Sequence, residues 1–499
     1  MKSGRELDQP DHAALAAADP TGRLYNEDLA PAPLDRRSWN AYSLLALWMS
    51  DAHNIGNYTF AAGLFAIGMA PYQIAIGILG GALIIFLGCT LSGFIGQKTG
   101  GPYPVVQRLS WGVFGANIPA LIRAIVAIAW YGIQTYLASV AVSVLLLRLA
   151  PGLTAMTHHG FLGLDSLSWA CFLFLWLLQL VVLTKGMEVV RRFQDWAGPA
   201  IWAIMIVLAV WLIVQAHGHV AFFTGVQHLS VGEQVYRTFA AVGLTVSVLA
   251  TLMLNFSDFA RFAPSRKAIV VGNFWGLPIN WTAFAVTSAV VSAATVAVYG
   301  KAILEPAQLL GMVSSTPLLI VGVIMFIIAT IGVNIVANFV SPSYDLANVW
   351  PKRITFRRGG VITAVVSVAA LPWKLYSSPA VIDGFLGTLG TLGAFLGPLF
   401  GIMMTDFYLV KRQLVSVSDL YNPDPGGAYH YRRGVNLRAL AAFLPSALVA
   451  AVIALVPVFG RIAPFSWFVG VAAAAVLYYA LSRHHDSRRR RATSARRGR

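Results

Sequence analysis

Twelve apolar stretches constrain this chain more than any other feature of its sequence. A helix that crosses a bilayer needs about 20 mostly apolar residues, because its side chains face lipid and its backbone must satisfy its own hydrogen bonds. Such stretches lie near residues 42–67, 72–97, 114–149, 166–184, 195–216, 236–257, 270–299, 316–346, 359–375, 382–410, 436–457 and 464–482. The sequence therefore predicts an all-α integral membrane protein with twelve transmembrane helices.

The composition excludes the common classes of soluble protein. Of the 499 residues, 57% are hydrophobic and 11% are charged, whereas soluble domains are about 45–50% apolar and about 25% charged. A soluble fold of this size could not bury so much apolar surface. Twelve helices use roughly 240–280 residues, which leaves short loops and two tails. The two cysteines, Cys89 and Cys171, lie in apolar stretches, and they are too few for a disulfide framework or a structural zinc site.

The distribution of Lys and Arg predicts the orientation. Loops after even-numbered stretches contain seventeen of these residues, and loops after odd-numbered stretches contain five. Because loops rich in Lys and Arg remain cytoplasmic, we predict cytoplasmic termini and an inner or plasma membrane location. We expect an N-terminal tail (1–40) without a signal peptide, a ten-helix core (41–410), a cytoplasmic loop (411–435), two peripheral helices (436–482) and a basic tail (483–499).

The C-terminal tail is strongly basic. It includes the run Arg488–Arg491, in a chain of net charge +16. Next to a last spanning helix, such a tail is expected to bind anionic lipid. Nucleic acid is the alternative partner, and the membrane context disfavours it. We therefore expect lipid and a small molecule as partners and no nucleic acid, while the oligomeric state is left open.

The first apolar stretch carries polar groups near its middle. They are Ser50, Asp51, His53, Asn54, Gly56 and Asn57. Polar groups at membrane depth are costly, and an unwound helix is tolerated only where it lines a cavity. We predict a break in the first helix that faces a polar site. The alternative is that this helix begins later and that these residues form a loop, but the apolar run 42–49 before them disfavours it.

The sixth stretch is interrupted in a similar way. Small and polar residues interrupt or follow it, namely Gly243, Thr245, Ser247, Thr251, Asn255, Ser257 and Asp258. Two interrupted helices five positions apart are typical of two inverted repeats around a site at the membrane midplane. Helices one to five and six to ten would then form the core. Asp258 and Arg261 are expected to form a structural pair or a gate at the cytoplasmic end.

Two pairs of side chains at helical spacing are candidates for ligand binding. Trp130 and Gln134 are four residues apart, so an indole for stacking and an amide for hydrogen bonding share one helix face. Asn334 and Asn338 repeat this spacing, and two amides could read the edge of a ring. The alternatives are an interfacial aromatic residue in the first pair and hydrogen bonds between helices in both.

Asp51 and His53 are the ionisable groups nearest the middle of a span, so either could carry a coupling proton. The chain has no zinc-protease, phosphate-loop or nucleophile-elbow motif. We therefore expect no enzyme activity, no bound metal and no cofactor other than a coupling cation.

Seven short motifs resemble one transporter family. They are Y-N-E-D-L-A-P from Tyr25, G-P-Y-P-V from Gly101, A-W-Y-G-I-Q-T-Y from Ala129, N-F-S-D-F-A-R-F from Asn255, N-I-V-A-N-F-V-S-P-S-Y from Asn334, L-P-W-K from Leu371 and G-P-L-F-G-I-M-M-T-D-F-Y-L-V-K-R from Gly397. With these motifs the chain resembles the nucleobase–cation symporter family one, which includes cytosine, uracil, allantoin and hydantoin permeases. It looks most similar to the allantoin and hydantoin branch.

The resemblance implies a LeuT-type fold of five-plus-five inverted repeats and transport by alternating access. It implies that Trp130 stacks on the substrate and that Gln134 and Asn338 bind its edge, with Asn334 one turn before. Asn54 matches a polar site residue of the first helix. Phe385 and Leu386 match the thin extracellular gate.

Two positions depart from the family pattern. Leu249 stands where allantoin and hydantoin members have a second tryptophan, so one aromatic face of the site is lost. Gly332 and Val333 stand where the sodium-dependent member has two hydroxyl groups.

A sodium site needs several hard oxygen ligands, and the carbonyl groups of Ser50, His53 and Ala329 would have to supply them. We therefore favour proton coupling through Asp51 or His53, and proton-coupled fungal relatives look similar in carrying an aspartate at position 51.

The expected function is secondary active import of a planar nitrogen heterocycle or ureide. The candidates are uracil, cytosine, purines, allantoin and hydantoins, carried with H⁺ or Na⁺. The alternative is an uncoupled facilitator or channel for the same solutes. A membrane enzyme and a receptor without flux are further alternatives.

Overall fold

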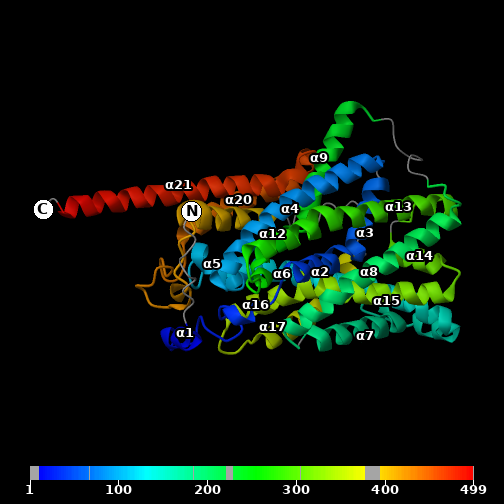
Figure 1. Ribbon diagram of the computed structural model, residues 1–499, viewed down its shortest axis with the longest axis horizontal. Coiled ribbons are helices and arrows are strands. Elements are labelled where there is room, and N and C mark those ends of the chain that lie inside the picture. The colour runs from blue at the N-terminus through cyan, green and yellow to red at the C-terminus, as the bar shows by residue number, and fades with distance from the viewer. Residues whose placement is uncertain are drawn as a thin grey trace.

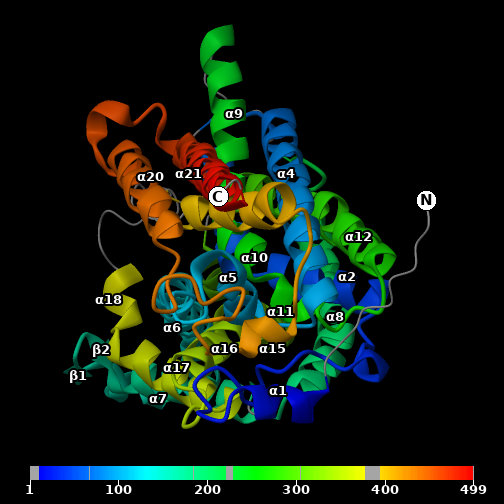
Figure 2. The same cartoon turned by 90° about the vertical axis from the view of Figure 1, so that its left-hand side faces the viewer.

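The chain folds into a long bundle of helices (Figures 1 and 2). The computed structural model describes residues 11–66, 68–183, 185–220, 229–303, 305–376 and 394–497. The described strands are β1 (Gly160–Phe161) and β2 (Leu164–Asp165), which pair antiparallel in one hairpin. The prediction of an all-helical architecture is therefore confirmed apart from this short hairpin.

The helices of the first half begin with a short one, α1, near the N-terminus. The elements are α1 (His12–Ala18), α2 (Ala41–Ala52), α3 (Ile55–Ala66), α4 (Pro71–Thr99), α5 (Tyr103–Trp111), α6 (Asn117–Leu149), α7 (Ser166–Leu183) and α8 (Met187–Gln215). Asn40 caps α2 by accepting a hydrogen bond from the backbone N–H of Ser43. Gly100 ends α4 in the left-handed conformation, which glycine adopts without strain.

The second half contains several interrupted helices. The elements are α9 (Val231–Val248), α10 (Ala250–Asn255), α11 (Ser257–Ala260), α12 (Arg266–Phe274), α13 (Thr282–Tyr299), α14 (Pro306–Met312), α15 (Thr316–Val333), α16 (Val340–Val349), α17 (Phe356–Ala369), α18 (Pro372–Tyr376), α20 (Leu437–Leu455) and α21 (Ser466–Arg497). Two π-helical segments, Trp275–Trp281 and Asn334–Phe339, join α12 to α13 and α15 to α16. Such π turns often occur at functional sites.

Seven helices of the described chain are long and apolar enough to cross a membrane, and the bent pair α9 and α10–α11 makes an eighth. The shorter apolar helices Ser166–Val182 and Ala394–Val410 lie within the predicted stretches 166–184 and 382–410, and residues 382–393 of the second stretch lie outside the described residues. The count of twelve spans stays a prediction.

Two helix boundaries differ from those predicted. α8 begins at Met187 rather than near 195, because Glu188 and Asp195 pair with Arg191 at helical spacing and stabilise a polar first turn. α21 continues to Arg497, well beyond the predicted end at 482. Arg and Ala are good helix formers, and no Gly or Pro interrupts 483–497.

The segment predicted as the N-terminal tail packs against the bundle in its described part. Leu24 and Leu29 are buried, and the loop 411–435 covers them. Arg108 of α5 donates to the carbonyl groups of Leu24 (2.8 Å) and Leu420 (2.9 Å). The tail, α5 and the loop therefore close one end of the bundle together.

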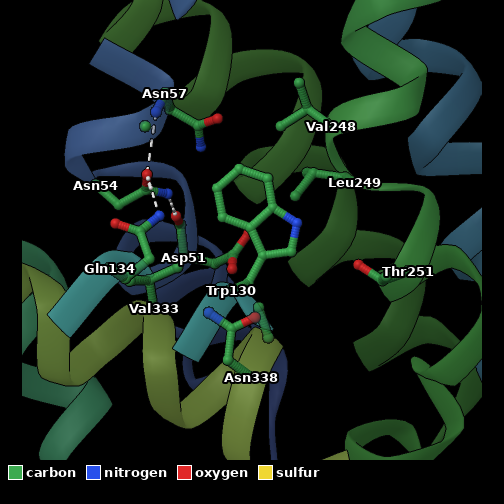
Figure 3. A pocket seen from close by; sticks show the side chains of 12 residues that line it. Asp51, Asn54, Asn57, Trp130, Gln134, Val248, Leu249, Thr251, Val333 and Asn338 are labelled. Carbon is green, nitrogen blue, oxygen red and sulfur yellow. Dashed lines mark hydrogen bonds between the residues drawn. The ribbon is translucent and has the colours of Figure 1, made fainter. Parts of the chain in front are cut away.

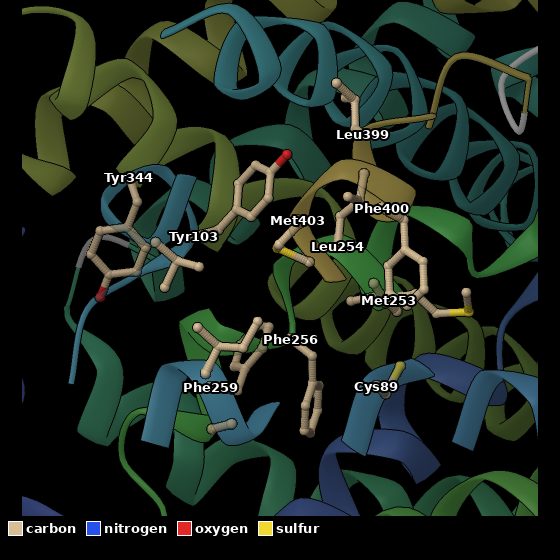
Figure 4. Close-up of a cluster of buried hydrophobic side chains, with 14 of the residues drawn as sticks. Cys89, Tyr103, Met253, Leu254, Phe256, Phe259, Tyr344, Leu399, Phe400 and Met403 are labelled. Carbon is tan, nitrogen blue, oxygen red and sulfur yellow. The ribbon is translucent and has the colours of Figure 1, made fainter. Parts of the chain in front are cut away.

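The largest apolar cluster lies beside the second half of the bent helix. Met253, Phe256 and Phe259 pack against α4, where Cys89 is buried, and against the helix Ala394–Val410 (Figure 4). This cluster packs α10 and α11 against α4.

Candidate functional site

The first interruption lies between α2 and α3. The helix ends at Ala52, and His53 has a non-helical conformation. Asn54 forms hydrogen bonds with backbone groups at the break. Its Nδ2 donates to the carbonyl of Asp51, and its Oδ1 accepts from the backbone N–H of Asn57 (3.0 Å). The prediction of a break at these polar residues is confirmed, and the break is held by side-chain amides.

The second interruption lies between α9 and α10. Leu249 leaves the helical conformation (φ −107°, ψ 18°), and the helix axis bends by 51° there. Leu249 is almost fully buried. The predicted interruption of the sixth stretch is confirmed, and the residue at the bend, Leu249, is apolar.

A cavity with an empty volume of about 480 Å³ lies between the two breaks. It is lined by Asp51, Asn54, Gly56, Asn57, Trp130, Gln134, Val248, Leu249, Thr251, Val333, Ala337 and Asn338 (Figure 3). These residues come from α2 and α3, α6, α9 and α10, and α15 with its π turn. Side chains from four distant parts of the sequence therefore meet at one place.

The structure brings together most of the predicted ligand-binding residues. Trp130 and Gln134 both line the cavity from one face of α6, and Asn338 lines it from the π turn. Gln134 donates through Nε2 to Asn54 Oδ1 (3.2 Å), which ties α6 to the first break. Asp51 also lines the cavity, and its two carboxylate oxygens accept no hydrogen bond from any residue that the structure describes.

Asn334 is the exception among these residues. It is fully buried and is not part of the cavity wall. Its Nδ2 donates to the carbonyl of Tyr131 (3.3 Å), to Thr135 Oγ1 (3.1 Å) and to Gln179 Oε1 (2.6 Å). Its Oδ1 accepts from Asn338 Nδ2 (2.9 Å). Asn334 therefore links helices and holds Asn338 in place, which is the structural alternative that its spacing allowed.

His53 points away from this cavity. Its Nε2 lies 2.9 Å from Asn280 Oδ1, which also accepts from Trp202 Nε1 (2.7 Å). Because an indole nitrogen only donates, the shared atom of Asn280 is the oxygen, and His53 Nε2 carries a proton. His53 also stacks on Phe284, with ring centroids 4.6 Å apart. Sequence reasoning missed Asn280 and Trp202, although the helix-breaking sequence G-L-P-I-N-W around Asn280 was a signal.

His53 lines a second, largely apolar cavity. This cavity has an empty volume of about 460 Å³ and also contains Tyr58, Phe284 and Ala329. Asn54 borders both cavities. The two predicted proton carriers therefore face different spaces: Asp51 faces the cavity with the indole, and His53 faces the apolar one.

The other predicted site residues occupy varied places. Ser50 is buried where α2 meets α15, and a Cβ on Gly332 would lie 3.2 Å from the Ser50 carbonyl oxygen. Phe385 and Leu386, the predicted gate, lie outside the described residues. Asp258 and Arg261 form hydrogen bonds with different residues. Asp258 accepts from the backbone N–H of Tyr103 (2.6 Å), and Arg261 donates to the hydroxyl of Tyr344 (3.2 Å).

Comparison with known proteins places this site in a family. Residues 31–480 match the family described as permease for cytosine/purines, uracil, thiamine, allantoin. The allantoin permease of Bacillus subtilis is 39% identical over 454 residues, which cover 90% of this chain and 91% of that protein. The purine-uracil permease NCS1 of Arabidopsis thaliana is 32% identical over 441 residues, 87% of this chain and 72% of that protein.

Solved structures show the same fold. Mhp1, a nucleobase-cation-symport-1 family transporter in a closed conformation with bromovinylhydantoin bound, has a TM-score of 0.73 at 24% identity, covering 92% of this chain and 95% of its own. Its inward-facing conformation has a TM-score of 0.70 at 22% identity, covering 93% and 94%. With the family match over most of its length, this chain belongs to the permeases for cytosine/purines, uracil, thiamine and allantoin, and it is a multi-pass membrane transporter of nucleobase-like substrates and not an enzyme.

Proposed function

We propose that this protein is a secondary active symporter that imports a planar nitrogen heterocycle or ureide, of the uracil, cytosine, purine, allantoin or hydantoin class. It acts in the inner or plasma membrane with both termini in the cytoplasm. Its twelve helices form two inverted repeats of five, of the LeuT type, and two peripheral helices. Transport follows alternating access, in which the cavity opens to one side of the membrane at a time.

One observation carries the proposal. The cavity between the two helix breaks combines the indole of Trp130 with the amides of Gln134 and Asn338. A flat ring can stack on the indole, and its polar edge can form hydrogen bonds with the amides. A purely apolar or strongly charged solute would leave these groups unpaired, at a cost in binding free energy. The chemistry of the wall therefore favours a planar polar ring.

The two breaks support alternating access. Each divides a long helix into two segments that can tilt separately, while the ring-binding residues stay between them. Mhp1, which shares this fold, has been solved in a closed conformation and in an inward-facing conformation. The packed end formed by the N-terminal segment, α5 and the loop 411–435 would have to open for release to the cytoplasm.

Proton coupling through Asp51 is the mechanism that the site favours. Its carboxylate lies in the wall of the ligand cavity, so proton and ligand can each change the affinity for the other. His53 is the second candidate, from the neighbouring cavity. For sodium, Gly332 and Val333 offer no side-chain oxygen beside Ser50 and Ala329, so the Ser50 hydroxyl and backbone carbonyls would be a sparse ligand set.

Uptake by proteoliposomes tests the proposed function. The full chain is reconstituted, and labelled uracil, cytosine, hypoxanthine, allantoin and hydantoin are offered with a proton gradient or a sodium gradient imposed separately. We expect one or more of these solutes to accumulate against its concentration gradient when a proton gradient is present. Accumulation that follows sodium alone would contradict the proton assignment. Flux that only equilibrates the solute would favour an uncoupled facilitator, and no flux of any solute would contradict the function.

A further inference from the structure

We propose that a basic groove at the start of α20 binds the headgroup of an anionic phospholipid, whose acyl chains lie along the outer face of that helix. The groove is lined by residues 425–428, 431–432 and 435–438, which belong to the loop and to the first turn of α20. It shares no lining residue with either cavity described above. The inference does not depend on which solute the protein carries. On the proposed orientation, the groove faces the cytoplasmic leaflet.

The groove lies at the level where the apolar part of the last two helices ends. Asn436, the residue before α20, hydrogen-bonds through Nδ2 to the hydroxyl of Tyr478 in α21 (3.2 Å), so the two helices are in register there. One turn further along α21, the exposed apolar residue Leu481 is followed by the exposed Arg483. Arginines near the ends of spanning helices extend to the membrane surface. The groove is therefore level with the lipid headgroups.

The charge of the groove is positive. Arg432 and Arg438 line it, and the described lining residues include no Asp or Glu. Neither guanidinium group forms an ion pair within the part of the chain that the structure describes. Asp406, which accepts from the Tyr478 hydroxyl (2.7 Å), is already paired with Lys411 (2.6 Å). A phosphate group fits this site, because guanidinium groups bind phosphate oxygens through parallel hydrogen bonds.

The turn that carries Arg432 is held in place by backbone hydrogen bonds. Arg432 and Val435 form an antiparallel bridge, with N–H to carbonyl distances of 3.2 and 3.1 Å. The carbonyl of Gly434 accepts from the backbone N–H groups of Phe114 and Gly115 (2.9 Å each), which fixes the turn to the start of α6. Binding to a fixed turn loses less conformational entropy than binding to a loose segment. The groove is therefore a more specific lipid site than a flexible basic segment.

The outer face of α20 offers an apolar surface for the acyl chains. Leu437, Leu444, Leu448 and Leu455 are all exposed, and their spacing of seven, four and seven residues places them on one side of the helix. Another side of α20 packs against α21, and both helices lie at the edge of the bundle (Figures 1 and 2). Leu437 also lines the groove, so the apolar face begins where the arginines lie. This continuity favours a lipid, which has an anionic headgroup and apolar chains, over a free phosphate ion.

Native mass spectrometry of the full chain tests the site, because one spectrum records both the bound lipid and the number of chains. The protein in a neutral detergent is titrated with dioctanoyl phosphatidylglycerol, and with dioctanoyl phosphatidylcholine, whose headgroup has no net charge. We expect phosphatidylglycerol to bind at least about tenfold more tightly than phosphatidylcholine. In Arg432→Gln/Arg438→Gln this preference should fall to about threefold or less, because each arginine near a lipid surface is worth roughly fivefold in affinity.

Two further variants separate the groove from a general effect of charge. Arg358→Gln/Arg412→Gln removes the same charge from exposed positions outside the groove, so the preference should stay within about threefold of the unsubstituted value. Arg432→Lys/Arg438→Lys keeps the positive charge, so it should prefer phosphatidylglycerol more strongly than the variant with two glutamines does. An equal loss of preference in the two glutamine variants would overturn the assignment to the groove.

Two competitors distinguish a lipid site from a simple anion site. They are inorganic phosphate and glycerophosphoglycerol, which is the headgroup without acyl chains. Neither should displace the lipid at an equal concentration, because neither has chains to bury. Displacement by either one would overturn the lipid assignment, as would equal binding of the two phospholipids. A spectrum with two chains and no bound lipid would also overturn it, since a second copy would then cover α20. Each of these results leaves the proposed function standing, because uptake by proteoliposomes tests that function separately.

Discussion

The two helix breaks that enclose the cavity differ in chemistry. At the first, Asn54 and Asn57 use their amides to satisfy the open backbone. At the second, Leu249 forms an apolar corner where the helix bends by 51°. One side of the cavity can therefore recognise hydrogen-bonding groups, while the other contributes shape and an apolar surface. The comparison shows that two helix breaks around one cavity can divide the tasks of ligand recognition.

The largest expected effect comes from the indole that lies between the two breaks. Replacing Trp130 with Ala should reduce uptake to background at normal expression, because stacking of a base on an aromatic ring is worth up to about 3 kcal/mol, or about 100-fold in affinity. Uptake in proteoliposomes measures the effect. Trp196→Ala is the control, because Trp196 is half exposed on α8. Normal uptake by Trp130→Ala would remove the assignment of the site.

Gly56→Ala tests the polar break without changing the apolar one. The new Cβ would press on the bonded pair of Asn54 and Gln134 at 3.1 and 3.3 Å. Overpacking of this kind costs about 1–3 kcal/mol, so we expect a loss of affinity of at least about tenfold. Gly63→Ala is the matched control on the same helix, because no atom lies within 4 Å of its new Cβ. Equal effects of the two substitutions in competition assays would show that the Asn54–Gln134 pair is not needed.

Asp51→Asn separates recognition from coupling at the polar break. With one proton per substrate, a pH difference of one unit can drive about tenfold accumulation. In this variant accumulation should fall to about the equilibrium level, because the side chain can no longer gain and lose a proton, while exchange of labelled substrate continues. If accumulation by Asp51→Asn still follows the pH gradient, the coupling role moves to His53 or elsewhere.

Leu249→Trp sharpens the comparison at the apolar break and has the smallest expected effect. A second aromatic wall should raise the affinity for planar rings by about three- to tenfold, because an aromatic pair adds about 0.5–1.5 kcal/mol beyond the area it buries. Equilibrium binding to the purified protein measures this gain. Leu249→Met, which keeps the volume, should leave the affinity almost unchanged. A gain in Leu249→Met as large as in Leu249→Trp would contradict the aromatic explanation.

Much of the site could be predicted from the sequence. Polar residues inside an apolar stretch predicted the first break, and four-residue spacing placed Trp130 and Gln134 on one face. The same spacing could not separate Asn334 from Asn338, because the answer depends on Tyr131, Thr135 and Gln179 in two other helices. The side of the helix break to which His53 points could not be predicted either, since its partner Asn280 lies 227 residues away along the chain.

A structure with a brominated ring tests the central claim most directly. The full chain is solved with 5-bromouracil or a brominated hydantoin, whichever competes in the uptake panel, and the bromine is located by its anomalous scattering. We expect the signal in the cavity between the two breaks, with the ring stacked on Trp130 and its polar edge toward the amides of Gln134 and Asn338. A signal in the apolar cavity beside His53, with the space next to Trp130 empty, would contradict the account.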